Sequence, residues 1–514
     1  MFVATGVDNG RTRWEQAVDS VRYRPGHVLA FVLALHVLVW TILPLLASHN
    51  LQLDLVEDLA LGKEWQIGYW KHPPLPWWLA DVAYRLTGDV RAVYVLGPLS
   101  TAICLWAVWR LGCLVVSREC ALIAALALEG IHFYNYSAVM FAHDQCQLPF
   151  WALSTWLLYR AITTRKPLDW LLSGLFLALA IWSKYAGLLL IGTILLMFLF
   201  DPTARKCWQT AGPYLMGFSF ALIAASQAWW LMRSGFQPFA YVDARAVVAT
   251  HWYQYLVFPL RWIGSQIGLL APTLALLAIV LWPPLLRLRL QGDEGFPQRY
   301  VTVIALGPFI LITLAATLTG RSLHAMWGYP LWSFAPLALL LWFAAHVQAG
   351  TARMRWFLLA FVGVFTSYPV AYAATIFAEP LVRDRLQAQQ FGGRLLAKTV
   401  TDAFRQRTQG ALVYVTGTEF AANNVAVYSE DRPHVIVHWD FGLSPWIDRN
   451  DVTKRGLIIV LDPTLVSNES WNDLRLRFPT AEFQPPLLIP RSTSVARPPV
   501  KVEWAIVPPA PAGS

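Results

Sequence analysis

Long runs of apolar residues alternate with short polar segments along the first three quarters of the chain. A transmembrane helix needs about 17–25 apolar residues, and eleven stretches reach or approach that length. They lie near residues 27–46, 90–112, 119–137, 145–162, 168–183, 185–200, 211–231, 260–285, 300–319, 325–346 and 355–376. The pattern predicts a polytopic α-helical membrane protein with about eleven transmembrane helices.

Beyond about residue 380 charged residues return and the apolar runs become short. Runs typical of buried strands lie at 411–415, 434–438, 456–462 and 502–507, and helical stretches are predicted at 419–429 and 470–478. Such alternation indicates an α/β domain. The sequence therefore predicts three parts, which are an N-terminal segment (1–26), a transmembrane domain (27–379), and an α/β domain with a loose Pro/Ala tail (380–514).

The distribution of Lys and Arg predicts how the spans are oriented. One set of alternate loops holds sixteen basic residues, and the other set holds nine, spread over longer loops. The sixteen are Arg11, Arg13, Arg22, Arg24, Arg110, Arg118, Arg160, Arg165, Lys166, Arg205, Lys206, Arg287, Arg289, Arg299, Arg353 and Arg355. Because basic loops stay in the cytoplasm, the N-terminus is predicted to be cytoplasmic and the α/β domain extracytoplasmic.

Composition agrees with a bilayer protein and argues against a nucleic-acid-binding protein. Hydrophobic residues make up 56% of the chain and charged residues 14%, and the mean hydropathy is +0.46. The net charge of +9 arises from short loops between apolar spans, so membrane topology explains it and no nucleic-acid partner is predicted. The five cysteines suggest neither a disulfide framework nor a CxxC metal site.

The loop after the first span, Asp54–Trp78, carries an unusual density of charge. Asp54, Glu57 and Asp58 have i, i+3, i+4 spacing and share one face if the segment is helical. The prolines at 73–74 end that element, and the aromatic residues after them predict a second helix in the membrane interface. Spacing alone leaves open an alternative in which the carboxylates merely face water on an amphipathic helix.

Three motifs in order along the chain resemble a known superfold. Asp54 is followed by His-Pro-Pro-Leu at 72–75, "AHDQCQLPFWAL" opens the fourth span at 142–153, and "WSKYAGLLL" lies at 182–190. This arrangement is similar to the membrane-embedded C-type glycosyltransferase superfold, and within it to glycosyltransferase family 39 in the broad sense. Relatives there are protein O-mannosyltransferases, lipid A aminoarabinose transferases and lipopolysaccharide galacturonosyltransferases. The resemblance covers about residues 27–376.

The resemblance implies an inverting enzyme that passes a sugar from a polyprenyl-phosphate carrier to a lipid, glycan or protein acceptor on the outer side of the plasma (bacterial inner) membrane. The acceptor hydroxyl must lose a proton, which requires a general base. The position that matches the family's base is Asp54. Many relatives have Glu directly after it, whereas Leu55 follows here and the nearest Glu is Glu57. Asp54 and Glu57 are therefore the predicted catalytic residues, with their division of labour open.

Departure of the carrier phosphate requires fixed cations or hydrogen-bond donors. Four residues at outer turns are predicted to converge on it: Lys71, His72, Lys184 and Arg321. The resemblance supports His72 in particular, because that family position is often basic. For Arg321 and the nearby His324, an alternative is simple positive charge at the headgroup interface.

Substrate contacts are predicted for Asp58, His143, Asp144 and His324. A carboxylate at the mouth of a span costs about 2–3 kcal/mol when it is pushed toward the bilayer centre, so Asp144 should have a partner. Sugar hydroxyls or Lys184 are the favoured partners. A divalent metal held by His143, Asp144 and Asp54 is the alternative, and no other cofactor is predicted.

The sequence also bears on a covering loop and on the choice between an enzyme and a transporter. The outer loop at 233–258 is predicted to include a helix that covers the cavity and excludes water from the reacting carbon. The competing class is a transporter or flippase of lipid-linked sugars. A transporter should carry ionisable groups within its spans, whereas the charges here gather at one face, which favours an enzyme.

Overall fold

The computed structural model describes residues 13–281, 295–343, 351–493 and 495–510. Parts of the predicted N-terminal segment, of the span ends near 285 and 346, and of the Pro/Ala tail lie outside these ranges, as do Arg11, Arg287 and Arg289.

Six described helical segments are long and apolar enough to cross a membrane, or seven if α9 and the segment after it, bent by 83°, form one span. The six are α2 (Pro25–Ala47), η1 with α5 (Val90–Val115), α11 (Gly212–Arg233), α13 (Gln254–Leu281), α14 (Phe296–Thr319) and α16 (Thr351–Phe377). Only 11% of the apolar stretch of α11 is buried, as expected of a helix at the edge of the bundle that faces lipid. The chain is therefore a multi-pass, mostly helical membrane protein, whereas the number eleven stays a prediction.

The chain before the α/β domain holds further described helices. They are α1 (Arg13–Tyr23), α6 (Arg118–Ala127), η2 (Leu128–Gly130), η3 (His132–Tyr134), η4 (Tyr136–Val139), α7 (His143–Thr164), α8 (Pro167–Ser183), α9 (Gly187–Phe200), α10 (Pro202–Arg205), η5 (Lys206–Gln209), η7 (Ala325–Trp332) and α15 (Ala335–Trp342).

The stretch 119–137 is not the continuous helix that its apolar run predicts, because α6 ends at Ala127 and short 3₁₀ helices follow. Polar side chains explain the break. Glu129 lies 2.9 Å from Nδ1 of His36 on α2, and Asn135 accepts a 2.9 Å hydrogen bond from Nε1 of Trp40. These groups cannot face lipid unsatisfied, so the chain leaves the helix and turns them against α2.

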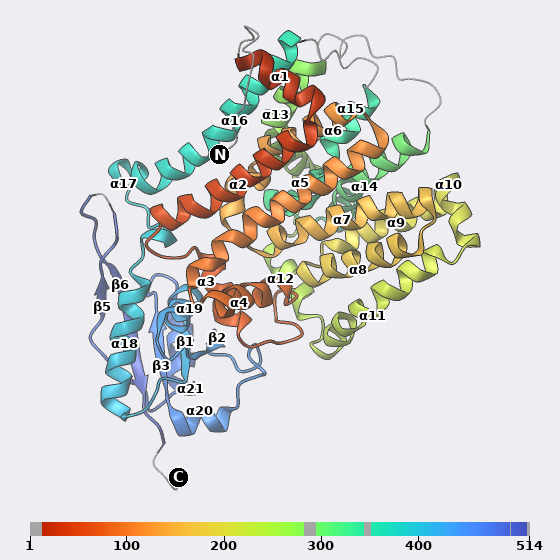
Figure 1. Ribbon diagram of the computed structural model, residues 1–514. Helices are drawn as coiled ribbons and strands as arrows, with labels where there is room; N and C mark the ends of the chain where they lie inside the picture. The colour runs from red at the N-terminus through yellow and green to blue at the C-terminus, as the bar shows by residue number, and fades with distance from the viewer. Residues whose placement is uncertain (1–12, 282–294, 344–350, 494, 511–514) are drawn as a thin grey trace.

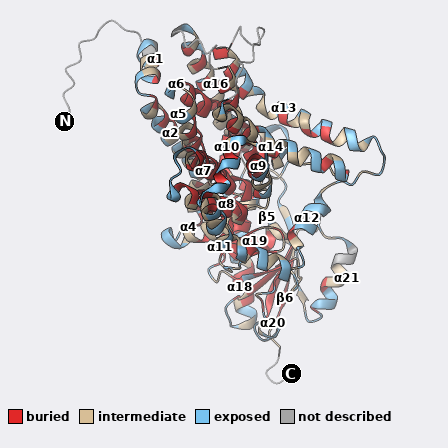
Figure 2. Cartoon of the chain, turned by 90° about the vertical axis from the view of Figure 1, so that its right-hand side faces the viewer, coloured by how far each residue is buried: buried red, intermediate tan, exposed pale blue. Residues whose placement is uncertain are grey.

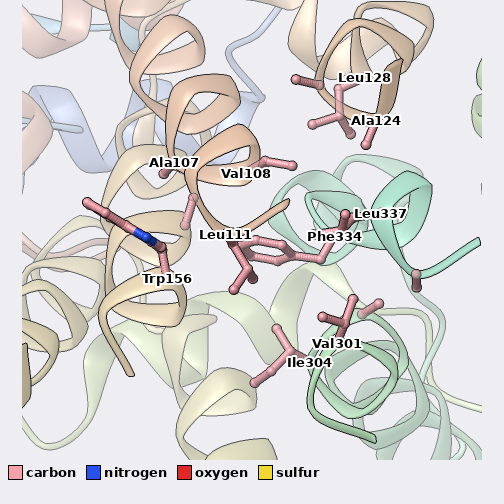
Figure 3. Packing of buried hydrophobic residues seen from close by; sticks show 14 of the residues in the cluster. Ala107, Val108, Leu111, Ala124, Leu128, Trp156, Val301, Ile304, Phe334 and Leu337 are labelled. Atoms are coloured by element: carbon pink, nitrogen blue, oxygen red, sulfur yellow. The ribbon is translucent and has the colours of Figure 1, made fainter. Parts of the chain in front are cut away.

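Apolar side chains from α5, α6, α7, α14 and α15 meet in one core (Figure 3). Leu111 of α5 lies beside Phe334, and Val301 of α14 packs below them. This core holds the helices that carry site residues in a fixed arrangement.

The C-terminal region is an α/β domain built on a sheet of strand order β2-β1-β3-β6-β4, with β5 paired to β6. Strand β1 is parallel to β2 and β3, and β6 is antiparallel to β3 and β4. The strands are β1 (Tyr414–Gly417), β2 (His434–Val437), β3 (Leu457–Leu461), β4 (Glu482–Phe483), β5 (Leu487–Ile489) and β6 (Val500–Val507). The helices are α18 (Gly393–Thr408), α19 (Glu419–Tyr428), α20 (Arg449–Arg455) and α21 (Asn468–Arg477), preceded by α17 (Glu379–Val382) and η9 (Ala388–Gln390).

All four predicted strands and both predicted helices of this domain are present, while α18, α20, β4 and β5 were not predicted. The first outer loop forms α3 (Leu53–Gly62) and α4 (Leu75–Thr87), and the loop at 233–258 forms α12 (Gln237–Arg245). These three helices lie where the helical part meets the α/β domain (Figure 1). Buried residues run from the helical part into the sheet, while α12 and α21 are mostly exposed (Figure 2).

Candidate functional site

The three carboxylates of the first outer loop lie on α3, and two of them are buried. The side chains of Glu57 and Asp58 are 5% and 1% exposed, while Asp54 is partly exposed. Helix α3 is pressed against α4 at Gly62, where an added Cβ would lie 2.1 Å from the carbonyl oxygen of Trp77. The alternative in which these carboxylates merely face water is therefore wrong for Glu57 and Asp58.

Lys71 lies between two carboxylates that come from different parts of the chain. Its Nζ is 2.5 Å from Oε1 of Glu57 on α3 and 2.7 Å from Oε1 of Glu419, the first residue of α19. Burial acts to lower the pKa of Lys71, but the two carboxylates outweigh it and the pKa is raised. Lys71 is therefore a firmly charged, fully paired ammonium.

The two carboxylates of this triad titrate differently. Burial raises the pKa of Glu57 to about 8, and Lys71 only partly opposes the shift. Burial also acts to raise the pKa of Glu419, but the charge of Lys71 and its hydrogen bond outweigh burial, so the pKa of Glu419 is lowered. Of the two carboxylates that hold Lys71, Glu419 is therefore the more readily ionised.

Asp144 and Lys184 form a second ion pair on the membrane side of the loop. The Nζ of Lys184 lies 2.7 Å from Oδ1 and 2.6 Å from Oδ2 of Asp144. Lys184 adopts an extended conformation after α8 ends at Ser183. Nε2 of Gln147 donates hydrogen bonds to the carbonyl oxygens of Ala180, in the last turn of α8, and of Lys184, just after it. The favoured pairing of Asp144 with Lys184 is therefore observed.

His72 and His143 pack against each other, with ring centroids 4.1 Å apart. Trp77 meets the ring of His143 edge-on at 5.0 Å, and Tyr241 of α12 meets His72 at 5.7 Å. Burial lowers the pKa of His72, and the neighbouring His143 and Lys184 lower it further. His72 is therefore neutral at physiological pH and can serve as a hydrogen-bond donor, one of the two kinds of group expected at the phosphate.

Asp54 takes part in neither ion pair. Among the residues that the structure describes, none forms a hydrogen bond or ion pair with it. Burial raises its pKa; Lys71 and Lys184 oppose the shift, and the charges of Glu419 and Asp144 add to it. Asp54 therefore lies near both ion pairs, besides Glu57 and Asp58 on its own helix.

Arg321 and His324 do not join this group, which corrects the predicted convergence. The guanidinium of Arg321 pairs with Asp243 of α12 at 2.7 Å, and its backbone bridges to Val248. The exposed ring of His324 contacts the carbonyl oxygen of Arg245 at 3.1 Å. Polar residues here fasten the two outer loops to each other, and their predicted substrate roles stay untested.

Two charged residues near the site were missed by the sequence analysis. Glu419 follows β1 and begins the helix that the sequence predicts at 419–429, but nothing in its local pattern points to Lys71. Arg245 ends α12, stacks on the ring of Tyr241 at 5.6 Å and acts electrostatically on His72. Among the described residues Arg245 has no carboxylate partner. Arg245 lies in the loop at 233–258 that is predicted to cover the cavity, and this position could have indicated a role at the site.

A metal site was the alternative for His143, Asp144 and Asp54. Within the part of the chain that the structure describes, no three His, Cys, Asp or Glu side chains are grouped so that they could hold a metal ion. The described residues thus offer no ligand set for a metal ion.

Comparisons with known proteins bear on the fold. The family model for dolichyl-phosphate-mannose-protein mannosyltransferase matches residues 71–230. The crystal structure of ArnT from Cupriavidus metallidurans bound to undecaprenyl phosphate is similar at a TM-score of 0.61 and 14% identity, over 94% of this chain and 98% of that chain. The apo ArnT structure gives 0.57 and 13% over the same shares.

A cryo-EM structure of the arabinofuranosyltransferase AftD from Mycobacteria is similar at a TM-score of 0.50 and 12% identity, over 94% of this chain and 41% of that chain. No curated protein sequence matches. The chain has the fold of the membrane-embedded C-type glycosyltransferases, and the resemblance predicted from its sequence is confirmed at that level.

Proposed function

We propose that this chain is an integral membrane glycosyltransferase that moves a sugar from a polyprenyl-phosphate donor to an acceptor hydroxyl. The observation that carries the proposal is the carboxylate of Asp54, unpaired and within reach of the charges of Lys71 and Lys184. A free carboxylate beside cations meets both needs of the reaction, which are a proton acceptor and a counter-charge for phosphate. The C-type fold and the mannosyltransferase match at 71–230 support the same class of reaction.

The reaction is a single displacement. Asp54 accepts the proton of the acceptor hydroxyl while the hydroxyl oxygen bonds to the anomeric carbon and the bond from that carbon to the phosphate oxygen breaks. The electron pair leaves with the polyprenyl phosphate, so no sugar–enzyme intermediate forms and the anomeric centre inverts. Because Glu57 is buried and held by Lys71 at 2.5 Å, whereas Asp54 has no such partner, Asp54 takes the role of base.

The departing phosphate needs donors that are not already neutralised. Lys71 and Lys184 are each held by carboxylates, which fixes their ammonium groups in place but offsets their charge. Arg245 is free of such a partner among the described residues and lies on the helix that covers His72. We assign the phosphate to Arg245 together with Lys71, Lys184 and the neutral His72, all at the level of the first outer loop.

An apolar groove between α13, α14 and α15 supports a lipid-borne donor. It is lined by Leu270, Thr273, Leu274, Thr302, Ala305, Leu306, Trp332, Ala335, Pro336, Ala338, Leu339, Trp342 and Phe343. Trp332 lies three residues after Tyr329, on which Asp54 and Asp144 act electrostatically. A mostly apolar groove of this kind suits a prenyl chain, and Trp332 connects its lining in sequence to a neighbour of the site.

The proposed setting follows from the distribution of charge. Sixteen basic residues in one set of loops support a cytoplasmic N-terminus and a site on the outer face of the plasma or inner membrane. The acceptor is a hydroxyl of a lipid, glycan or protein in the cell envelope, with lipopolysaccharide as one candidate. Eleven crossings and the domain limits 27–379 and 380–514 remain part of this proposal.

A panel of radiolabelled polyprenyl-phosphate sugars, offered to the purified protein in lipid, tests the function. We expect one donor to lose its sugar to an acceptor or, slowly, to water, with release of polyprenyl phosphate. The transporter alternative makes the opposite prediction, because intact lipid-linked sugar would cross a liposome bilayer without any cleavage at the anomeric carbon. Movement without cleavage for every donor would reject the enzyme.

Arg245→Gln tests the assignment of the phosphate. A hydrogen bond to a charged group contributes roughly 1.5–3 kcal/mol, so we expect the Kd for undecaprenyl phosphate to rise about tenfold or more. Arg233→Gln is the matched control, because Arg233 lies in the same outer region but its guanidinium stacks on Trp229. Equal affinity of the two variants would remove Arg245 from the phosphate site.

A further inference from the structure

The α/β domain presents the carboxyl ends of its parallel strands to the first outer loop. In an open α/β sheet these ends form the edge where ligands bind. Here Glu419 follows β1 and His438 follows β2 at that edge, and α3 of the transmembrane part lies against both. The edge that would hold a ligand in a free-standing domain is therefore occupied by the loop that carries Asp54.

The position of Glu419 is set rigidly by the sheet. Gly417 has φ of +144°, and an added Cβ would lie 1.7 Å from the carbonyl oxygen of Val460. Thr418 donates its backbone N–H to that same oxygen at 3.0 Å, and its hydroxyl accepts the backbone N–H of Asp462 at 2.9 Å. The turn is thus fixed to β3, and Glu419 extends from a rigid base toward the membrane part.

A small pocket with a mostly apolar lining and a few polar groups lies where the two parts meet. Glu57 and Leu61 line it from α3, and Glu419, Asn423 and His438 line it from the α/β domain. His438 has a left-handed backbone with φ of +47°, a conformation that costs energy in residues other than glycine. The interface is therefore specifically shaped around the Glu57–Lys71–Glu419 triad.

We propose that the α/β domain completes the active site, with Glu419 as a positioning residue that holds the ammonium of Lys71 beside Glu57 and Asp54. The inference rests on the proposed function and extends it. Lys71 lies on an irregular segment between α3 and α4, and Glu57 alone supplies one side of its coordination. Glu419 supplies the other side from a body 348 residues away in sequence. A role in acceptor recognition is not needed to explain why this domain is docked here.

The proposal requires a readout that loose docking alone would not change. Asp54 is faced by Lys71, Glu419, Asp144 and Lys184, besides Glu57 and Asp58 on its own helix. The charge of Glu419 raises the pKa of Asp54 and also that of Lys71. Removing this charge lowers both pKa values, so the whole pH profile of kcat/KM should move to lower pH.

Glu419→Gln and Glu419→Asp are compared with His434→Gln in the full-length protein in lipid. His434 pairs with Glu64 at 2.9 Å across the same interface but does not contact Lys71, so it controls for docking. Misplacement of a reacting group by about 1 Å costs up to about 100-fold in rate. We expect Glu419→Gln to lower kcat between about tenfold and 100-fold and to shift the profile acidward. Glu419→Asp should recover part of the rate at the original pH.

Failure of the role of Glu419 can be told apart from failure of the role of Asp54. Trypsin cleavage after the exposed Arg383 and Arg385 reports docking of the domain. If Glu419→Gln and His434→Gln lose rate equally, without a shift of the pH profile and with faster cleavage in both, Glu419 only fastens the domain and the inference fails. If Glu419→Gln equals wild type, it also fails. If Asp54→Asn retains full transfer, the assignment of the base fails instead.

Discussion

Asp54→Asn is expected to lower kcat by about 10²–10⁴-fold, the range that a general base contributes. Asparagine keeps the size of the side chain but cannot accept the proton of the acceptor hydroxyl. The pKa of Asp54 is raised by burial, so in the wild type the rate should rise with pH through a value above 3.8, where the carboxyl becomes ionised. The measurement is kcat against pH with the donor identified from the panel.

Stability distinguishes lost chemistry from lost folding in this variant. At neutral pH an unfolded Asp with an ordinary pKa is ionised, and the raised pKa of the folded state means that folding opposes this charge. Removing it should therefore leave Tm unchanged or higher. Asp89→Asn is the matched control, since Asp89 lies in the same connection between the first two spans, is about half exposed, and among the described residues pairs with Arg91. Comparable activity of the two variants would remove Asp54 from the base role.

Lys184→Met is expected to destabilise the protein by about 3 kcal/mol, because it leaves the buried carboxylate of Asp144 without a counter-charge. The double variant Lys184→Met with Asp144→Asn removes both charges and should recover most of this loss. It should not recover sugar transfer, because the reaction still lacks the cation. The measurement is the free energy of unfolding in mixed micelles, beside turnover.

An exposed pair gives the scale for this effect. Arg91→Met breaks the ion pair with Asp89, whose side chains are about half exposed, and should cost less than about 1 kcal/mol. A double variant at Asp144 and Lys184 that is no more stable than the single one would show that burial of an unpaired charge is not the cause of the loss.

Local pattern was sufficient wherever a few neighbouring residues decide the structure. The i, i+3, i+4 carboxylates predict α3, and the prolines at 73–74 predict the break before α4. Alternating β-branched runs predict β1, β2, β3 and β6. The continuous span at 119–137 failed because hydropathy averages over Glu129 and Asn135, while the folded chain must find each a partner. Helix α18 was missed because its amphipathic pattern is mostly polar.

The sequence by itself determined the membrane class, the resemblance to the C-type superfold and the residues Asp54, Lys71, His72, Asp144 and Lys184 as a group at one face. Only the tertiary structure decided how these charges are paired. It left Asp54 alone, joined Lys71 to Glu419 across 348 positions of sequence, and held Arg321 on α12 instead of at the site. The reason is physical. Helices and strands form from contacts a few residues apart, whereas the pKa and the partner of a buried charge depend on groups that only folding brings near it.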